Sequence, residues 1–515
     1  MQSEQSLVLK PELDGISVAA QPDSLSTRKE PDSSSTRKMD RSLLDSVAWN
    51  TATDWISQIF TWALFLITIR VLSPADFGLL ALQVVLLPLA YTSTLGIGRA
   101  VVTLRELTEE QISQLNTVGL LLGLGSYALA AAAALPVARF YKIPRLVPVI
   151  LVSSLGMIIN GAQLVSNGLM MKEMRYRALC TFNALTAVVT ALLTVLFAWR
   201  GWGYWALIFG GMAGGILRST LVLLARPHAY AFPRWSSVSQ PLAFGRHCVV
   251  STMAADVYES LDNFTAGRVL GPAALGLYGM AWTLANLPME KVTSMVTMVI
   301  ATYLAAIKND LAALRRYIRN LTECIALLTF PGCVGLGLVV HEFVPVVLGP
   351  KWLGMAGPMA VLSIYAGLRS IVALIPKLLV SMGNSRFVMW VDLITLPVLG
   401  IAFYIGSYWG ITGIAWGWVV AYPWVVLPLY RKAFAAIKMS AMEYLRPLRP
   451  ALEGTIVMTM AVVSVRHALP GNWIVSVRLA LEVLTGVLFY AATLWLRHRE
   501  RIFALVQTIK DLRRG

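Results

Sequence analysis

Charged residues are scarce in this chain. Only 14% of its 515 residues are Asp, Glu, Lys or Arg, whereas 57% are hydrophobic and the mean hydropathy is +0.67. A soluble domain carries about one-quarter charged residues and cannot expose so much apolar surface. Apolar stretches of about 20 residues recur from Ser42 onwards, each long enough to cross a hydrocarbon core of roughly 30 Å. The composition excludes a soluble protein and predicts an all-α integral membrane protein with many spans.

Motifs for metal binding and catalysis are also missing. The five histidines are scattered, and the four cysteines lie within or beside apolar runs without the spacing of a metal site: Cys180, Cys248, Cys324 and Cys333. No GxxxxGK[ST] or Gly-x-Ser-x-Gly motif occurs, and no large soluble segment is present. We therefore expect no metal, no cofactor, no ATP hydrolysis and no enzymatic activity.

Acidic residues are the rarer charge, 27 against 43 Lys and Arg, which gives a net charge of +16. The basic residues cluster in alternate loops, as membrane orientation requires, and this distribution argues against a nucleic-acid partner. Placing both termini in the cytoplasm puts about 28 Lys and Arg inside and about 9 outside, which satisfies the positive-inside rule. The expected location is the bacterial cytoplasmic (inner) membrane, with both termini cytoplasmic.

The first 41 residues lack the apolar side chains that folding requires. They contain a tandem nonapeptide, residues 22–30 and 31–39, and no apolar core of a signal peptide. We expect residues 1–41 to be a disordered cytoplasmic tail.

Fourteen spans are predicted, with Pro and Gly at many of the junctions between them. They cover residues 44–71, 77–97, 115–138, 146–170, 178–199, 203–225, 243–267, 274–304, 318–340, 355–382, 387–408, 411–431, 450–469 and 474–496.

A ten-residue segment occurs twice. Arg70–Leu79 and Arg268–Leu277 start 198 positions apart and match at seven of ten positions. Six spans separate the copies, so both enter the bilayer in the same orientation, which predicts a parallel duplication about an axis along the membrane normal. We expect two six-helix lobes in a V shape around a central cavity, followed by two C-terminal helices. The lobes and the C-terminal part are expected to cover residues 42–235, 236–434 and 435–515.

The chain resembles a known family at several of these positions. The segments that carry the resemblance are Leu72–Leu79, Leu169–Arg177, Gly201–Leu207, Leu261–Tyr278 and Phe343–Trp352. They are similar to signatures of the polysaccharide transporter family, in the multidrug/oligosaccharidyl-lipid/polysaccharide flippase superfamily. The resemblance covers roughly residues 42–430 and agrees with the family's layout of fourteen spans.

The resemblance implies a flippase that moves a polyprenyl-pyrophosphate-linked oligosaccharide to the outer leaflet for capsule, exopolysaccharide or lipopolysaccharide (O-antigen) synthesis. The implied partners are the lipid-linked oligosaccharide and membrane lipid, with a polysaccharide polymerase and export machinery as further candidates. Two alternatives stay open: a multidrug or lipid II exporter of the same superfamily, and, less favoured, a membrane polymerase or glycosyltransferase. The second alternative lacks the large extramembrane loop that such enzymes usually present.

Cations within the predicted spans are candidates for the substrate site, because a pyrophosphate cannot cross hydrocarbon unaided and Arg and Lys bind phosphate. We assign headgroup binding to Arg218, Arg246, Arg369 and Lys377. Lys291, beside Glu290, is a weaker candidate. The alternative for all five is that their side chains extend to the membrane interface.

Predicted span seven carries a polar stripe. At about 100° per residue, one face roughly 60° wide holds Thr252, Asp256, Glu259 and Asn263. We interpret Asp256, Glu259 and Asn263 as an ion-coupling site for H⁺ or Na⁺. The structural alternative is an internal ion pair with an arginine.

Span one carries a comparable stripe that includes Asp54, which is a further ion-coupling candidate. Asp262 is assigned to the structural signature of the family. Tryptophans near span ends, in a set that includes Trp409, Trp416, Trp418 and Trp424, are expected to be interfacial anchors.

Overall fold

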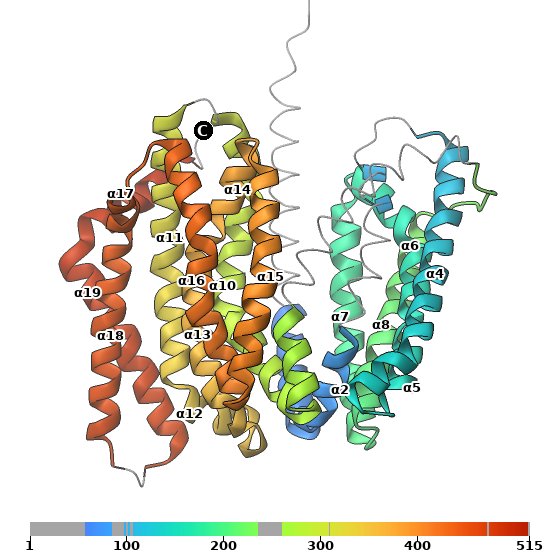
Figure 1. Ribbon diagram of the computed structural model, residues 1–515, viewed down its shortest axis with the longest axis horizontal. Coiled ribbons are helices and arrows are strands. Elements are labelled where there is room, and N and C mark those ends of the chain that lie inside the picture. The colour runs from blue at the N-terminus through green and yellow to red at the C-terminus, as the bar shows by residue number, and fades with distance from the viewer. Residues whose placement is uncertain are drawn as a thin grey trace, which may run out of the picture. The chain divides into compact units, whose positions relative to one another are not determined.

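The computed structural model describes residues 57–84, 97–98, 101–102, 107–234, 260–307, 310–470 and 473–512, with the side chains of 294–307 and 500–512 left out. Throughout these residues the secondary structure is helical, without a strand (Figure 1). Ten helices of this part are long and apolar enough to cross a membrane. An eleventh span is added if the bent pair Ser57–Val71 and Pro74–Leu82 counts as one. Spans one, two and seven of the expected fourteen lie partly outside the described residues.

The first half of the chain contains six described helices after Ser57–Val71. They are α2 (Pro74–Val84), α4 (Glu109–Tyr141), α5 (Leu146–Ser153), α6 (Leu155–Lys172), α7 (Tyr176–Trp199) and α8 (Tyr204–Ala225). Helix α4 begins at a capping box, in which the Thr108 side chain accepts from the Gln111 backbone and the Gln111 side chain accepts from the Thr108 backbone. Figure 1 shows α4, α6, α7 and α8 side by side.

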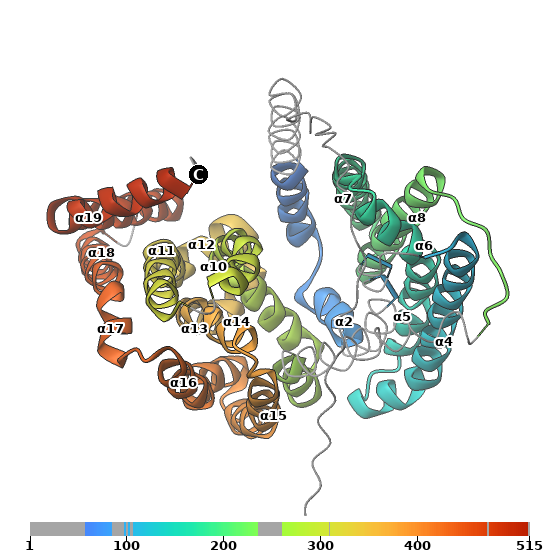
Figure 2. The ribbon, with the colours of Figure 1, turned by 90° about the horizontal axis from the view of Figure 1, so that it is seen from above.

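The second half contains the remaining helices. They are α10 (Pro272–Ile307), α11 (Leu311–Leu338), α12 (Val340–Phe343), η1 (Val344–Leu348), η2 (Pro350–Met355), α13 (Ala356–Val372), α14 (Leu374–Ser381), α15 (Ser385–Ser407), α16 (Gly410–Ile437), α17 (Ala441–Leu445), η3 (Arg446–Leu448), α18 (Arg449–Ala468) and α19 (Val475–Leu512). Helix α13 packs against α10, α11 and α16, and α15 pairs with α16 (Figure 2). The expected boundary at residues 235/236 lies outside the described residues.

Small residues let neighbouring helices approach closely, as is usual in membranes. Helix α4 meets α6 at Gly119 and Gly161, where a β-carbon on Gly161 would lie 2.6 Å from the carbonyl oxygen of Gly119. Helix α15 meets α16 at Gly406 and Gly413, and a β-carbon on Gly406 would overlap the Gly413 carbonyl. At these crossings the small residues let the backbones of the paired helices come into contact.

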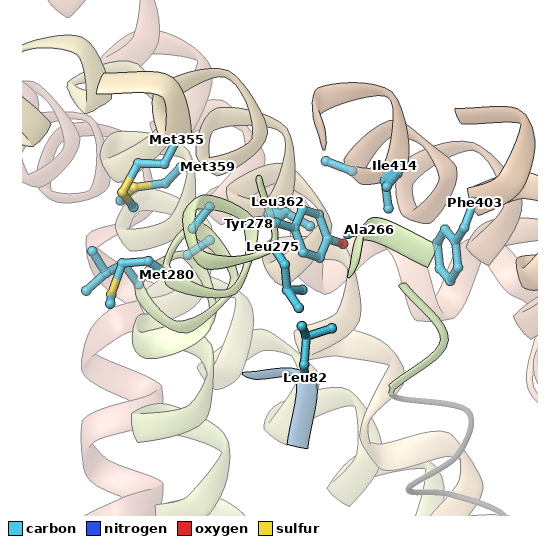
Figure 3. Packing of buried hydrophobic residues seen from close by; sticks show 14 of the residues in the cluster. Leu82, Ala266, Leu275, Tyr278, Met280, Met355, Met359, Leu362, Phe403 and Ile414 are labelled. Atoms are coloured by element: carbon cyan, nitrogen blue, oxygen red, sulfur yellow. The ribbon is translucent and has the colours of Figure 1, made fainter. Parts of the chain in front are cut away.

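The two copies of the ten-residue repeat contact each other. A β-carbon on Gly78 would overlap the carbonyl oxygen of Pro272, and one on Gly276 would overlap the carbonyl oxygen of Pro74. The contacts are therefore reciprocal, and they place α2 against α10. Buried apolar side chains surround the crossing, and Figure 3 shows Leu82 of α2 facing Leu275 of α10.

Helices α18 and α19 pack on each other, and both contact α11, while α19 also contacts α12. Arg466 of α18 makes a two-point ion pair with the fully buried Glu482 of α19, at 3.1 and 2.7 Å, and a third bond of 3.1 Å to Glu342 of α12. A buried carboxylate is costly unless ion pairs or hydrogen bonds compensate its charge. The pair of helices is thus held by buried charge as well as by apolar contact.

Candidate functional site

Arg218, one of the expected headgroup cations, lies within α8 and is half-buried. Its Nη2 is 3.5 Å from Oδ1 of Asn167 in α6, and its buried Nε has no hydrogen-bond partner among the described residues. A buried guanidinium with an unsatisfied donor retains capacity for an anionic ligand. Elsewhere on α6, Gln163 donates from Nε2 to Oδ1 of Asn160 at 2.9 Å, and the buried Oε1 of Gln163 has no hydrogen-bond partner among the described residues.

Arg369 lies within α13 and is half-buried. Its guanidinium carbon stands 5.8 Å from the ring centre of Trp282 in α10, a cation–π distance. The Trp282 ring packs in turn on Tyr365 and Trp418, with centroids 5.8 and 5.3 Å away. The cation is thereby placed at the margin of an aromatic cluster rather than in a loop.

The other predicted site residues have different surroundings. Lys377 lies in α14 and is exposed, and Asn263 is half-buried one residue after Asp262. Lys291 donates from Nζ to Oε1 of Gln58 at 3.1 Å, a bond between α10 and the helix Ser57–Val71. Four further candidates lie outside the described residues: Arg246, Asp54, Asp256 and Glu259. The ion-coupling site therefore stays a prediction.

Asp262 is fully buried and receives three hydrogen bonds. Its Oδ2 accepts from the Tyr278 hydroxyl at 2.8 Å and from Trp418 Nε1 at 3.0 Å, and its Oδ1 accepts from the backbone N–H of Asn263 at 2.7 Å. No ion pair to Asp262 is formed within the described part of the chain. The carboxylate is compensated by neutral donors, and it links the segment 260–269 to α10 and α16.

Trp418 differs in its surroundings from the other tryptophans of this part of the chain. Trp409, Trp416 and Trp424 are 72%, 48% and 73% exposed, as anchors would be, but Trp418 is fully buried. Two residues along a helix turn the side chain by about 200°, so Trp416 and Trp418 face opposite sides of α16. The sequence signal for this cluster was the signature Leu261–Tyr278, whose ends supply both Asp262 and its donor Tyr278.

A cavity of about 640 Å³ opens between α15 and α16, away from these cations. Its lining is almost entirely apolar and includes Ala402, Gly406, Trp409, Gly413, Trp416 and Gly417. Without a charged group it does not fit a diphosphate. Within the described residues no group of three or more His, Cys, Asp or Glu could hold a metal ion, and the three cysteines described, Cys180, Cys324 and Cys333, are free.

The described residues form a polytopic helical fold with half-buried cations inside two of its spans, and solved structures agree with the fold. The chain is similar to a structure titled "Lipid II flippase MurJ, inward closed conformation", with a TM-score of 0.68 at 14% identity, covering 88% of this chain and 100% of that one. This likeness extends to the fold alone.

Residues 67–357 match the family described as "Polysaccharide biosynthesis protein", and the chain belongs to this family. Among curated relatives, the Escherichia coli (strain K12) lipopolysaccharide biosynthesis protein WzxC is 24% identical over 68% of this chain and 72% of its own. The Bacillus subtilis (strain 168) teichuronic acid biosynthesis protein TuaB is 23% identical over 77% of this chain and 83% of its own. The resemblance found in the sequence is confirmed.

Proposed function

We propose that this protein is a flippase for a polyprenyl-pyrophosphate-linked oligosaccharide, moving it from the cytoplasmic to the outer leaflet for capsule, exopolysaccharide or lipopolysaccharide synthesis. The observation that carries the proposal is membership of residues 67–357 in the polysaccharide biosynthesis family, in a chain with ten described helices able to cross a membrane. The proposal includes both termini in the cytoplasm, fourteen spans and two six-helix lobes.

In this proposal Arg218 and Arg369 bind the pyrophosphate. Arg218 has an unsatisfied buried donor, and the Arg369 guanidinium lies over the Trp282 ring within a membrane-spanning helix. A planar guanidinium offers paired donors to phosphate oxygens. The lipid tail stays in the bilayer, and rocking of the two lobes moves the headgroup across. The chain acts as a transporter and not as an enzyme.

Transport is driven, in this proposal, by a gradient of H⁺ or Na⁺ acting on Asp256 and Glu259. An intramembrane carboxylate is costly unless it pairs or binds a cation, so such groups are favoured for ion coupling. Replacing both by amides is expected to make the flipping rate insensitive to pH and Na⁺ gradients. If the flipping rate of this double variant still depended on the gradients as in wild type, ion coupling would have to be assigned to other residues.

The test of the flippase function is reconstitution. Purified protein in proteoliposomes is supplied with a lipid-linked oligosaccharide labelled in its glycan, and the fraction reached by an added glycosidase is followed with time. Flipping is expected in wild type, with a loss of about tenfold or more in Arg369→Ala, since charge-assisted hydrogen bonds to phosphate are lost. Arg386→Ala, an exposed cation at the start of α15, is the matched control.

Two results would count against the proposal. If the labelled glycan became accessible no faster in vesicles with the protein than in vesicles without it, the flippase function itself would be rejected. Normal flipping by Arg369→Ala would remove only this residue from the headgroup site. The second candidate function, lipid II or drug export, shares the fold, and selective flipping of lipid II or drug in the same vesicles would favour it.

A further inference from the structure

Residues 69–70 are joined to residues 346–352 by four hydrogen bonds. Arg70 donates from Nη2 to the Val346 carbonyl at 2.6 Å and from Nε to the Val347 carbonyl at 3.1 Å. In return Lys351 Nζ donates to the Arg70 carbonyl at 2.8 Å, and Trp352 Nε1 donates to the Ile69 carbonyl at 3.0 Å.

These bonds satisfy helix ends reciprocally. Ile69 and Arg70 lie in the last turn of the helix Ser57–Val71, whose final carbonyls have no partner within the helix. Val346 and Val347 lie at the end of η1, whose final carbonyls likewise have no partner within the helix. Each segment thus supplies side-chain donors for the free carbonyls of the other.

The second copy of the repeat makes the corresponding contact by different chemistry. Arg268, the equivalent of Arg70, stands 5.1 Å over the ring of Phe140 at the end of α4. Phe140 stacks on Phe264 at 5.1 Å. The repeat arginine of each half therefore reaches the segment after the third predicted span of the other half, one by carbonyl hydrogen bonds and one by a cation–π contact.

The glycine crossing of α2 and α10 belongs to the same repeat, since Gly78 and Gly276 follow Arg70 and Arg268 by eight residues. The contacts come from segments after predicted spans one, three, seven and nine. In the proposed orientation all of these segments lie on the outer side.

We propose that these contacts form the outer gate of the transporter, with Arg70 as its latch, and that the gate must part in each cycle. This inference rests on the proposed flippase function and orientation. Arg70 and Lys351 are exposed, so water can replace their bonds when the halves separate. The Arg268–Phe140 contact is a cation–π contact without a hydrogen bond. The hydrogen bonds of the gate that water can replace are therefore those of Arg70 and Lys351.

Cross-linking tests whether the gate must open. In a chain with all four cysteines replaced by Ser, Val71→Cys and Leu353→Cys are joined by a reducible bifunctional thiol reagent. Both positions are exposed, 40% and 49%, and adjoin the bonded residues without replacing them. Flipping is expected to stop on cross-linking and to return on reduction. Full flipping by the cross-linked protein would overturn the gate.

A control pair and a second measurement separate the gate from the proposed function. Trp199→Cys with Trp202→Cys, exposed positions at one end of α7 and α8, is expected to be cross-linked without loss of flipping. If wild type does not flip the substrate at all, the flippase proposal fails, and the gate is then decided by accessibility alone.

Accessibility is measured at Leu82→Cys, a fully buried position on α2, with an impermeant thiol reagent added from outside. Arg70→Ala is expected to raise the labelling rate about tenfold, since two charge-assisted hydrogen bonds are lost. Arg70→Lys, which retains one donor, is expected to fall between. Arg145→Ala, an exposed cation between α4 and α5, should match wild type. Equal rates in Arg70→Ala, Arg70→Lys and wild type would overturn the latch.

Discussion

Gly78 and Gly276, the ninth residues of the two repeat copies, lie against each other where α2 crosses α10. Each α-carbon faces backbone atoms of the other helix, including the carbonyl oxygens of Pro272 and Pro74. Backbone atoms cannot swing aside as a flexible side chain can. The separation of the two helices at this point is therefore set by the absence of side chains.

Gly276→Ala is expected to destabilise the protein by about 1–3 kcal/mol, the usual cost of overpacking, because its methyl group would overlap the Pro74 carbonyl. The measurement is the apparent melting temperature in detergent. Gly279→Ala is the matched control on the same helix, because nothing lies within 4 Å of its β-carbon position. Equal melting temperatures for the two variants would contradict the close crossing.

Trp418→Phe is expected to lower stability more than Trp416→Phe does. Trp418 donates to the buried Asp262 carboxylate at 3.0 Å, and a hydrogen bond to a charged group contributes about 1.5–3 kcal/mol. Trp416 is 48% exposed on the same helix. The double variant Trp418→Phe/Tyr278→Phe should be non-additive, since both donors serve one oxygen. Strict additivity in the melting temperatures would show that the two donors act independently.

The segment after α8 is expected to loosen at acid pH. His228 in this segment has a buried Nε2 without a hydrogen-bond partner among the described residues. Burial, with a contribution from the neighbouring Arg226 guanidinium, lowers the pKa of His228, and Glu109 and Glu173 oppose this only in part. Between the lowered pKa and the unfolded value of about 6.5, the unfolded segment binds more protons, so stability is lost as the pH falls.

Hydrogen exchange tests this pH dependence. Backbone amides of residues 226–234 should exchange faster at pH 5.5 than at pH 7.5 after correction for the intrinsic rate. His228→Gln should remove the difference, while the Arg226–Glu173 ion pair of 2.8 Å stays in place. A wild-type protein that shows the same corrected rates at both pH values would rule out the histidine effect.

The positions of the described helices follow from the length of the apolar runs and from the polar, Pro and Gly residues between them. Expected span 178–199 is α7, Tyr176–Trp199, and expected span 387–408 is α15, Ser385–Ser407, because apolar runs of this length end at polar or glycine-containing junctions. Breaks within spans were not predicted. The expected span 355–382 divides between α13 and α14 at Ala373, because Pro376 has no N–H to donate to the carbonyl of Val372, the last residue of α13.

Partners across the fold were harder to predict than helices. Arg466 lies near the end of the expected span 450–469, yet it binds Glu482 and Glu342 from two other helices. Hydropathy treats each residue by itself, whereas an ion pair depends on which helix faces which. For the same reason, the sequence predicts Arg369 inside a span, but its contact with Trp282 depends on the packing of α10 on α13.

The crossing of α2 and α10 has a bearing on the ancestry of this chain. In a symmetric dimer, residue i of one subunit touches residue j of the other, and j touches i. Gly78 with Pro272 and Gly276 with Pro74 satisfy that condition within one polypeptide. This geometry is the one expected if a half-length ancestor formed a symmetric dimer through this glycine before the gene was duplicated and fused. After fusion, a side chain larger than glycine at either position requires the backbone of the other half to move.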